Sequence, residues 1–304
     1  MKQLKDFTRL TSYRKKQDIE TNDAYTTALY THTTGLDVVV TSYDYKKKDS
    51  QYHLLKREAE LLQFIARNQE KRSVSVTVPR VLSVIDRGGR LVVIREAAAG
   101  PVLSRATQGT KVAVYNACVD EFEKIGSMMN AEERSSYLHV TRRDMNRAFF
   151  NSLLRRWLKN HDLLTSLIKL AYSYYVNGNK RDATDVLTVR DLTATSIVYR
   201  EPQVVVTDVR RAVFTERGAE YALFPQLYYR AVGTETMKTY LDTTFDTPFK
   251  KRQFMRLAAF YAVTESPDEY VKILADSIIP YVTDTLKNRA DARRLTLAVD
   301  TQPS

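Results

Sequence analysis

The sequence VLTVRDLTATSIVYREPQVVVTDVRRA, residues 186–212, contains two short β-branched runs, each of which ends near an aspartate. The first run precedes Asp191 and the second precedes Asp208, while a further extended run, residues 197–199, lies between them. Apolar runs of this length predict strands. We therefore expect a small β-meander whose loop ends bring the two carboxylates close together.

Paired carboxylates at loop ends suit phosphoryl transfer. One carboxylate positions the attacking hydroxyl group, and the other holds a magnesium ion against the phosphates. Taken singly, Asp191 and Asp208 could equally end a loop or pair with Arg190, Arg210 or Arg211, their neighbours in sequence. The pair, flanking predicted strands, favours the catalytic interpretation.

The segment resembles the catalytic core of the protein-kinase-like fold, as found in aminoglycoside and choline phosphotransferases. Their motif is H-[GR]-D-x-x-x-x-N, followed by a hydrophobic strand and a second aspartate. Residues 189–196 (VRDLTATS) and 204–208 (VVVTD) match it in order. Residues 207–212 (TDVRRA) are also similar to the second-aspartate motif of lipopolysaccharide-core sugar kinases. The resemblance implies that Asp191 is the catalytic base and that Asp208 is a ligand of Mg²⁺.

Two positions of the motif differ from the family pattern. Val189 stands in place of the usual histidine, and Ser196 stands in place of the asparagine that serves as the second metal ligand. Ser196 is carried over as a magnesium ligand beside Asp208, although a serine hydroxyl is a shorter and weaker ligand than an amide oxygen. ATP and Mg²⁺ are the cofactors that the resemblance implies.

The element order before this segment is that of the same fold. Residues 36–43 predict a strand, and residues 54–66 (LLKREAELLQFIA) have apolar residues at helical spacing with charged residues opposite. Two glycines, Gly88 and Gly89, separate two apolar runs and predict a hairpin. By element order the resemblance covers residues 25–262.

A connector at residues 97–101 follows the predicted hairpin. The resemblance implies that it is the hinge of the kinase-like fold, where backbone groups of Arg95 and Ala97 bind the adenine. In the family, a glutamate of the helix pairs with a lysine on the preceding strand, and this lysine holds the α and β phosphates. Glu58 matches the glutamate and is carried over to the nucleotide site, but Thr41 stands at the lysine position.

The nucleotide side of the predicted cleft differs from the family in a further respect. The segment expected to cover the phosphates, residues 13–24, contains no glycine, and its predicted turn at residues 20–23 carries two acids. Glycines allow backbone N–H groups to close on phosphate, whereas carboxylates repel it. Glu58 itself could equally lie on a solvated helix face.

These elements together predict an α+β, two-lobed, protein-kinase-like fold. A small β-rich lobe is expected over residues 1–97, and a larger, mainly helical lobe carrying the catalytic-type loop over residues 98–304. Capping motifs and apolar periodicity predict the helices of the second lobe. They cover residues 111–129, 141–157, 162–176, 219–232, 234–241 and 249–263, and a last helix opens with a capping box at residues 266–269.

Composition limits the class of protein and its partners. The formal net charge of +11 favours acidic partners, namely nucleotide phosphates, nucleic acid or an anionic membrane face, although solubility alone would also explain it. The chain has no apolar run long enough to form an integral membrane segment and no signal-peptide core, so we expect a cytoplasmic protein. The single cysteine, Cys118, excludes an intramolecular disulfide and is expected to be buried.

Two other classes of site are not supported by the residue pattern. Four scattered histidines and one cysteine do not form a zinc-ligand spacing, and the G-x-S-x-G elbow of serine hydrolases is absent. The leading hypothesis is a divergent phosphotransferase that moves the γ-phosphate of ATP to a hydroxyl group of a small molecule or sugar, with an acidic acceptor if arginine pairs line the cleft. The alternatives are a pseudokinase-like binding or regulatory protein and a basic scaffold on nucleic acid or membrane.

Overall fold

The computed structural model describes residues 12–21, 25–45, 48–69, 76–177 and 185–288. Contacts within the chain divide it into two compact units, Met1–Leu138 with Val189–Val213 and His139–Thr188 with Phe214–Ser304. These units do not test the expected lobe boundary between residues 97 and 98, which stays a prediction. Each unit is described by itself.

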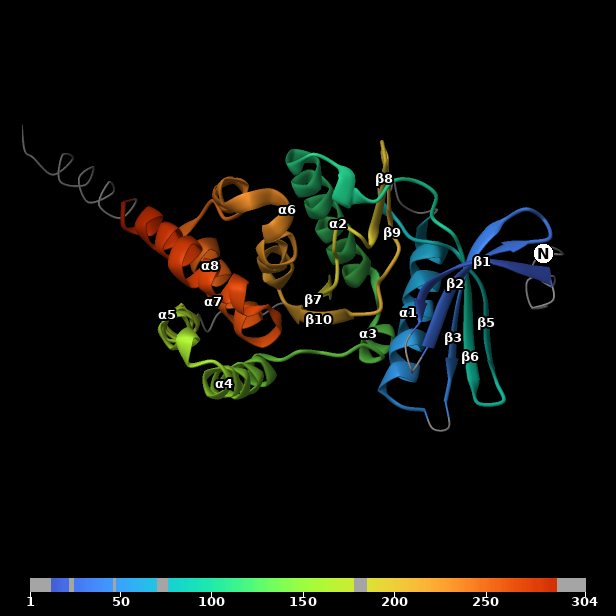
Figure 1. The fold of residues 1–304 in the computed structure, drawn as a ribbon, viewed down its shortest axis with the longest axis horizontal. Coiled ribbons are helices and arrows are strands. Elements are labelled where there is room, and N and C mark those ends of the chain that lie inside the picture. Colours follow the sequence, from blue (N-terminus) through green and yellow to red (C-terminus); the bar gives the residue numbers. More distant parts are fainter. Residues whose placement is uncertain (1–11, 22–24, 46–47, 70–75, 178–184, 289–304) are drawn as a thin grey trace, which may run out of the picture. The chain divides into compact units, whose positions relative to one another are not determined.

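A five-stranded antiparallel sheet in the order β1-β2-β3-β6-β5 forms the N-terminal part of the first unit (Figure 1). Its strands are β1 (Tyr13–Thr21), β2 (Tyr25–His32), β3 (Asp37–Asp44), β5 (Val81–Arg87) and β6 (Arg90–Glu96). Helix α1 (Ser50–Gln69) packs Tyr52, Leu55 and Ala59 against Tyr43 and Leu91 of the sheet. The spacing of these three residues places them on one helix face, so the predicted strand and helix are confirmed.

The predicted hairpin joins β5 to β6. Gly88 and Gly89 have φ values of 61° and 76°, and two consecutive residues with positive φ form the tight turn that matches the twist of paired strands. After β6 the chain runs through the expected connector, where Gly100 has a φ of 141°. A Cβ atom on Gly100 would lie 2.9 Å from Cγ1 of Val198, so only glycine allows this close approach.

The segment that carries the two aspartates forms the predicted strands, but not the predicted meander. Strand β8 (Ile197–Arg200) pairs with β9 (Gln203–Val206), and β9 also pairs in parallel with β4 (Val76–Thr77). Strand β7 (Asp185–Val189) pairs instead with β10 (Ala212–Glu216). The single meander was therefore wrong, because apolar patterns predict strands but do not determine which distant strand becomes the partner.

Helices α2 (Gln108–Met128) and α3 (Ala131–Ser135) complete the first unit, with the short 3₁₀ turn η3 (Leu103–Arg105) before them. Asn130 accepts a hydrogen bond from the N–H of Glu133, and the Glu133 carboxylate accepts one from the N–H of Asn130, which is the capping box of a helix start. Cys118 on α2 is fully buried, as expected, and burial raises the pKa of its thiol to about 12.

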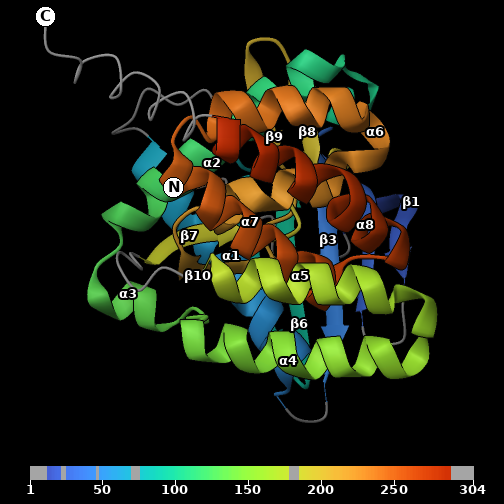
Figure 2. The ribbon, with the colours of Figure 1, turned by 90° about the vertical axis from the view of Figure 1, so that its left-hand side faces the viewer.

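The second unit is helical. Its helices are α4 (Arg142–Lys159), α5 (Leu164–Val176), α6 (Ala219–Thr244), α7 (Pro248–Glu265) and α8 (Asp268–Ile273), with the short elements η4 (His161–Leu163) and η5 (Leu274–Ile278). Figure 2 shows α4 and α5 side by side, and both pack against α7. None of the helices among the described residues is long and apolar enough to span a membrane.

Most predicted helix boundaries of this unit are confirmed. Thr141 and Asp144 form the expected capping box of α4, and Gly233, with a φ of 72°, interrupts α6 at the predicted break. The capping box at residues 266–269 was wrong, because the Ser266 hydroxyl donates to the Tyr261 carbonyl instead of capping α8. With its small antiparallel-sheet N-terminal region and larger helical C-terminal part, the fold is α+β, as predicted.

Replacing Gly100 by alanine should lower the free energy of unfolding by about 1–3 kcal/mol, because the new methyl group meets Val198 and the backbone conformation is strained. Gly109→Ala is the matched control. Gly109 lies in α2 with open space around it, so alanine should gain up to about 1 kcal/mol in helix propensity. Urea unfolding of both variants checks this, and equal stabilities would contradict it.

Candidate functional site

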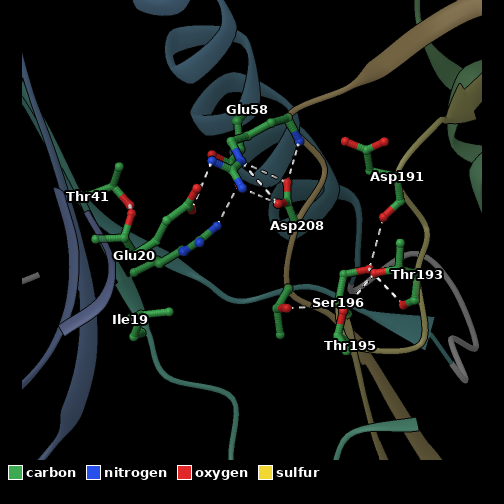
Figure 3. A pocket seen from close by; sticks show the side chains of 13 residues that line it. Ile19, Glu20, Thr41, Glu58, Asp191, Thr193, Thr195, Ser196 and Asp208 are labelled. Carbon is green, nitrogen blue, oxygen red and sulfur yellow. Dashed lines mark hydrogen bonds and ion pairs between the residues drawn. The ribbon is translucent and has the colours of Figure 1, made fainter. Parts of the chain in front are cut away.

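A cavity of about 360 Å³ in the first unit is lined by residues from several separate segments of the chain (Figure 3). In Figure 3, Ile19, Glu20 and Thr41 lie on one side and Asp191 with the loop that follows it on the other. The lining comprises Ile19, Glu20, Thr27, Thr41, Glu58, Arg95, Asp191, Thr193, Thr195, Ser196, Thr207, Asp208 and Arg210. The fold thus brings together five of the six predicted site residues; the sixth, Ala97, does not line the cavity.

The buried ion pair between Glu58 and Arg95 connects helix α1 to strand β6. Nη1 of Arg95 lies 2.7 Å from Oε1 of Glu58, and the two side chains are 13% and 3% exposed. Glu58 therefore does not lie on a solvated helix face. Burial raises the pKa of Glu58, and the charge of Arg95 opposes this rise.

Arg95 thus provides the cation that the family takes from the preceding strand. At the family's lysine position, Thr41 is buried, and its Oγ1 lies 3.1 Å from Oγ1 of Thr27. The sequence analysis assigned only the backbone of Arg95 to a site. The side chain of Arg95 was overlooked because a pairing between α1 and β6 leaves no local sequence pattern. In the sheet, Arg95 lies directly opposite Val39 of β3.

The expected hinge groups are partly engaged within the protein. The N–H of Ala97 donates to the carbonyl of Asp37 at 3.0 Å. Arg95 lies inside β6, where it is paired with β3 on one side and β5 on the other. Binding of adenine by Arg95 and Ala97 stays a prediction.

The carboxylate of Asp208 is held by Arg210, two residues further along the chain. Nε of Arg210 lies 3.1 Å from each carboxylate oxygen, and Nη2 also donates to Oδ2. The main-chain N–H of Arg210 donates to Oδ1 at 3.0 Å, a local turn that aspartate side chains favour. Burial would raise the pKa of Asp208, but the hydrogen bonds and charge of Arg210 outweigh it, so the pKa lies below its ordinary value.

Arg210 is held in turn by the first hairpin of the sheet. Its Nη1 donates to the Tyr25 hydroxyl at 2.6 Å, its guanidinium lies 5.3 Å from the centre of the Tyr25 ring, and Nη1 is 3.6 Å from Oε2 of Glu20. The Tyr25 hydroxyl also donates to Glu20. We call Glu20, Tyr25, Asp208 and Arg210 the Arg210 cluster. Burial lowers the pKa of Arg210, but the hydrogen bonds and charges of its partners, Asp208 above all, outweigh burial and raise this pKa above its ordinary value.

Asp191 and Ser196 belong to the same short loop. Asp191 is 43% exposed, and its Oδ2 lies 3.0 Å from Nε of Arg211. Burial raises the pKa of Asp191, and Arg211 offsets only part of the rise. The Ser196 hydroxyl donates to the main-chain carbonyls of Asp191 and Thr193, at 3.1 and 2.9 Å, so it stabilises the loop itself.

The predicted magnesium ligands do not fit a metal site as they are arranged. Mg²⁺ requires near-octahedral oxygen ligands and usually takes one or two carboxylates. Both oxygens of Asp208 accept hydrogen bonds from Arg210, and the Ser196 hydroxyl is engaged with its own loop. Within the described part of the chain, no group of three or more histidines, cysteines or acids is placed to hold a metal ion.

The cavity also has an acidic lining, in contrast to the basic chain. Four carboxylates and two guanidinium groups line it, which gives a formal charge of −2. Charges on a low-dielectric wall act strongly on a ligand inside it. By this formal count the lining is less favourable to a triphosphate than a basic cleft would be.

Comparison with known proteins identifies the fold. No family model and no curated protein matches the sequence. Among solved structures, an apo form of aminoglycoside phosphotransferase APH(4)-Ia is similar with a TM-score of 0.60 and 12% identity, over 96% of this chain and 97% of that chain. The chain has the kinase-like fold of the aminoglycoside phosphotransferases.

Two nucleotide-bound structures show the same kinase-like fold. APH(4)-Ia in a ternary complex with AMP-PNP and hygromycin B has a TM-score of 0.58 and 13% identity, over 94% of this chain and 95% of that chain. ADP-bound APH(2'')-Ib has a TM-score of 0.56 and 14% identity, over 93% and 96%. The predicted kinase-like fold is thus confirmed over almost the whole chain.

Replacing Arg95 by leucine should destabilise the protein by about 3–5 kcal/mol, because Glu58 is left buried without a partner. The double variant Glu58→Leu/Arg95→Leu should recover most of this loss, since two apolar side chains can replace a buried ion pair. Urea unfolding of both variants measures the difference. A double variant that is less stable than Arg95→Leu would contradict this reading of the pair.

The interaction between Arg210 and Asp208 should make stability depend on pH. The pKa of Asp208 in the folded protein lies below its ordinary value of 3.8, so the stabilisation is complete above that value and is lost as the pH falls through the folded pKa. Arg210→Gln should therefore cost about 1.5–3 kcal/mol at pH 6 and less at pH 3, which lies below the ordinary pKa of the carboxyl group. Arg230→Gln, at an exposed pair with Glu269, is the control. An equal cost of Arg210→Gln at both pH values would contradict the assignment.

Proposed function

We propose that this protein is a non-catalytic, pseudokinase-like binding protein, which keeps the kinase-like fold and its cleft but does not use Mg·ATP. One observation carries the proposal: the carboxylate that would hold the metal is bound on both oxygens by Arg210 of the same chain. A guanidinium group matches a carboxylate in a fixed planar geometry and makes charge-assisted hydrogen bonds. A metal ion at Asp208 would have to displace the guanidinium group of Arg210.

Displacement of Arg210 from Asp208 would break more than one interaction. The guanidinium is only 22% exposed, and its departure would also leave the Tyr25 hydroxyl and Glu20 without their cation. Buried groups that lose a charged partner cost more than exposed ones. The Arg210 cluster is therefore a stable alternative to a metal site.

The phosphate side of the cleft supports the same proposal. Thr41 replaces the lysine that would bind the phosphates, and Arg95 is already neutralised by Glu58. Glu20, which was expected in the phosphate-covering turn, lies instead on strand β1, lines the cavity and adds negative charge there. Three separate features of this cleft thus oppose a triphosphate.

One observation favours a second candidate, the phosphotransferase. Asp191 lines the same cavity as Asp208, is partly exposed, and has a pKa raised by burial, which suits a residue that accepts a proton. In this candidate Asp191 is the base, Asp208 and Ser196 hold Mg²⁺ after Arg210 has moved away, and Arg95, Ala97 and Glu58 serve the nucleotide. The acceptor would be a hydroxyl group of a small molecule or sugar.

Thermal unfolding with and without Mg·ATP separates the two candidates. A ligand that binds the native state stabilises it, by about 2.7 kcal/mol at a concentration one hundred times its Kd. We expect the melting temperature to stay unchanged at millimolar Mg·ATP. A concentration-dependent rise would contradict the non-catalytic proposal.

The variant Asp208→Asn is the control for that measurement. If the melting temperature does rise, Asp208→Asn should abolish the part of the rise that depends on magnesium and leave any part that ATP alone produces. A magnesium-dependent rise that Asp208→Asn leaves intact would show that Asp208 does not hold the metal, and would contradict the phosphotransferase candidate as well.

A further inference from the structure

Helices α4 and α5 expose an unusual amount of apolar surface. Of the large hydrophobic side chains that are exposed among the described residues, most lie on these two helices, and each of them is between 41% and 69% exposed. We define the α4–α5 surface by these residues: Phe150, Leu154, Trp157, Leu158, Leu164, Ile168, Tyr172, Tyr175 and Val176. Exposed apolar side chains that gather on neighbouring helices are typical of interaction sites.

The exposed residues form one stripe on each helix. Phe150, Leu154 and Leu158 follow one another at intervals of four along α4, and Leu164 and Ile168 begin the same spacing on α5, so each set shares a helix face. Other faces of both helices pack against α7 (Figure 2). The two stripes therefore turn away from the core of the unit.

Basic side chains accompany the apolar stripe. Arg143 and Arg147 are exposed, and they precede Phe150 by seven and three residues, which places them on the same face of α4. Arg155 and Lys159 are exposed on the adjacent face. Residues 142–177 carry seven arginines and lysines against two aspartates, a formal charge of +5, and two of the cations, Arg156 and Lys169, are paired with Asp268 and Asp276 outside this range.

We propose that the α4–α5 surface docks on an anionic lipid bilayer. Surface-binding helices combine a face of Trp, Phe and Leu, which enters the boundary between headgroups and acyl chains, with Arg and Lys that meet anionic headgroups. The α4–α5 surface has both parts, while neither helix is able to cross the bilayer. The two helices would lie on the membrane.

The positive charge of the α4–α5 surface favours an anionic membrane over a second copy of the chain as its partner. A self-association through this surface would bring the exposed cations of two copies together, and like charges at an interface disfavour the complex. An anionic bilayer instead neutralises them. Nucleic acid is a less suitable partner, because binding to its phosphate backbone depends mainly on cations and gives the apolar stripe no role.

Vesicle co-sedimentation of the full chain tests the proposal. We expect binding to vesicles of phosphatidylcholine and phosphatidylserine in a 7:3 ratio, weaker binding at high salt, and little binding to phosphatidylcholine alone. The variant Phe150→Ser/Leu158→Ser/Ile168→Ser should bind at least tenfold more weakly. Arg143→Gln/Arg147→Gln should lose roughly 30-fold, since each cation near an anionic surface contributes a factor of about five.

Two controls keep the test independent of folding. Phe249→Ser removes an apolar side chain of α7 that is 45% exposed, and Arg252→Gln removes an exposed cation there. Both variants should bind like the unchanged protein, and circular dichroism should show the same helix content for all variants. Absence of binding to anionic vesicles would overturn the proposal. So would light scattering that shows a dimer which the triple serine variant converts to a monomer.

Discussion

The contact between Arg210 and Asp208 is the interaction on which the candidate site depends. The D-V-R sequence places the guanidinium two residues from the carboxylate, so the contact forms locally, and the bonds from Arg210 to Tyr25 and Glu20 then connect this loop to the first hairpin of the sheet. A positive group thus occupies the position where the resemblance implies a metal ion. The Asp208 carboxylate is therefore neutralised within the chain itself.

The buried pair of Glu58 and Arg95 explains how the fold survives the loss of the family's lysine. A glutamate on α1 without any cation would destabilise the small lobe by several kcal/mol, of the order of 3–5. Arg95 provides that cation from β6, so Thr41 is free to pack in the sheet. The ion pair connects the helix to the sheet.

Sequence reasoning predicted what local chemistry determines. Alternating and helical apolar patterns located β3, α1 and the hairpin at Gly88, and a capping motif located the start of α4. It also raised the pairing of the aspartates with neighbouring arginines as an alternative, which both Arg210 and Arg211 adopt. The pairing of β7 with β10 and of Arg95 with Glu58 joins residues far apart in the chain. Tertiary packing selects such partners, and no local pattern in a single sequence indicates them.

The most direct test of the occupied metal position uses Mn²⁺ as a paramagnetic substitute for Mg²⁺. Titration of the protein with Mn²⁺ in the presence of ATP, followed by electron paramagnetic resonance, measures the free ion against an ATP-only reference. If Arg210 holds Asp208, the protein leaves the Mn²⁺ spectrum of the reference unchanged at every ratio. Stoichiometric binding of Mn²⁺ that Asp208→Asn abolishes would show that the carboxylate is available to a metal, and would contradict the account.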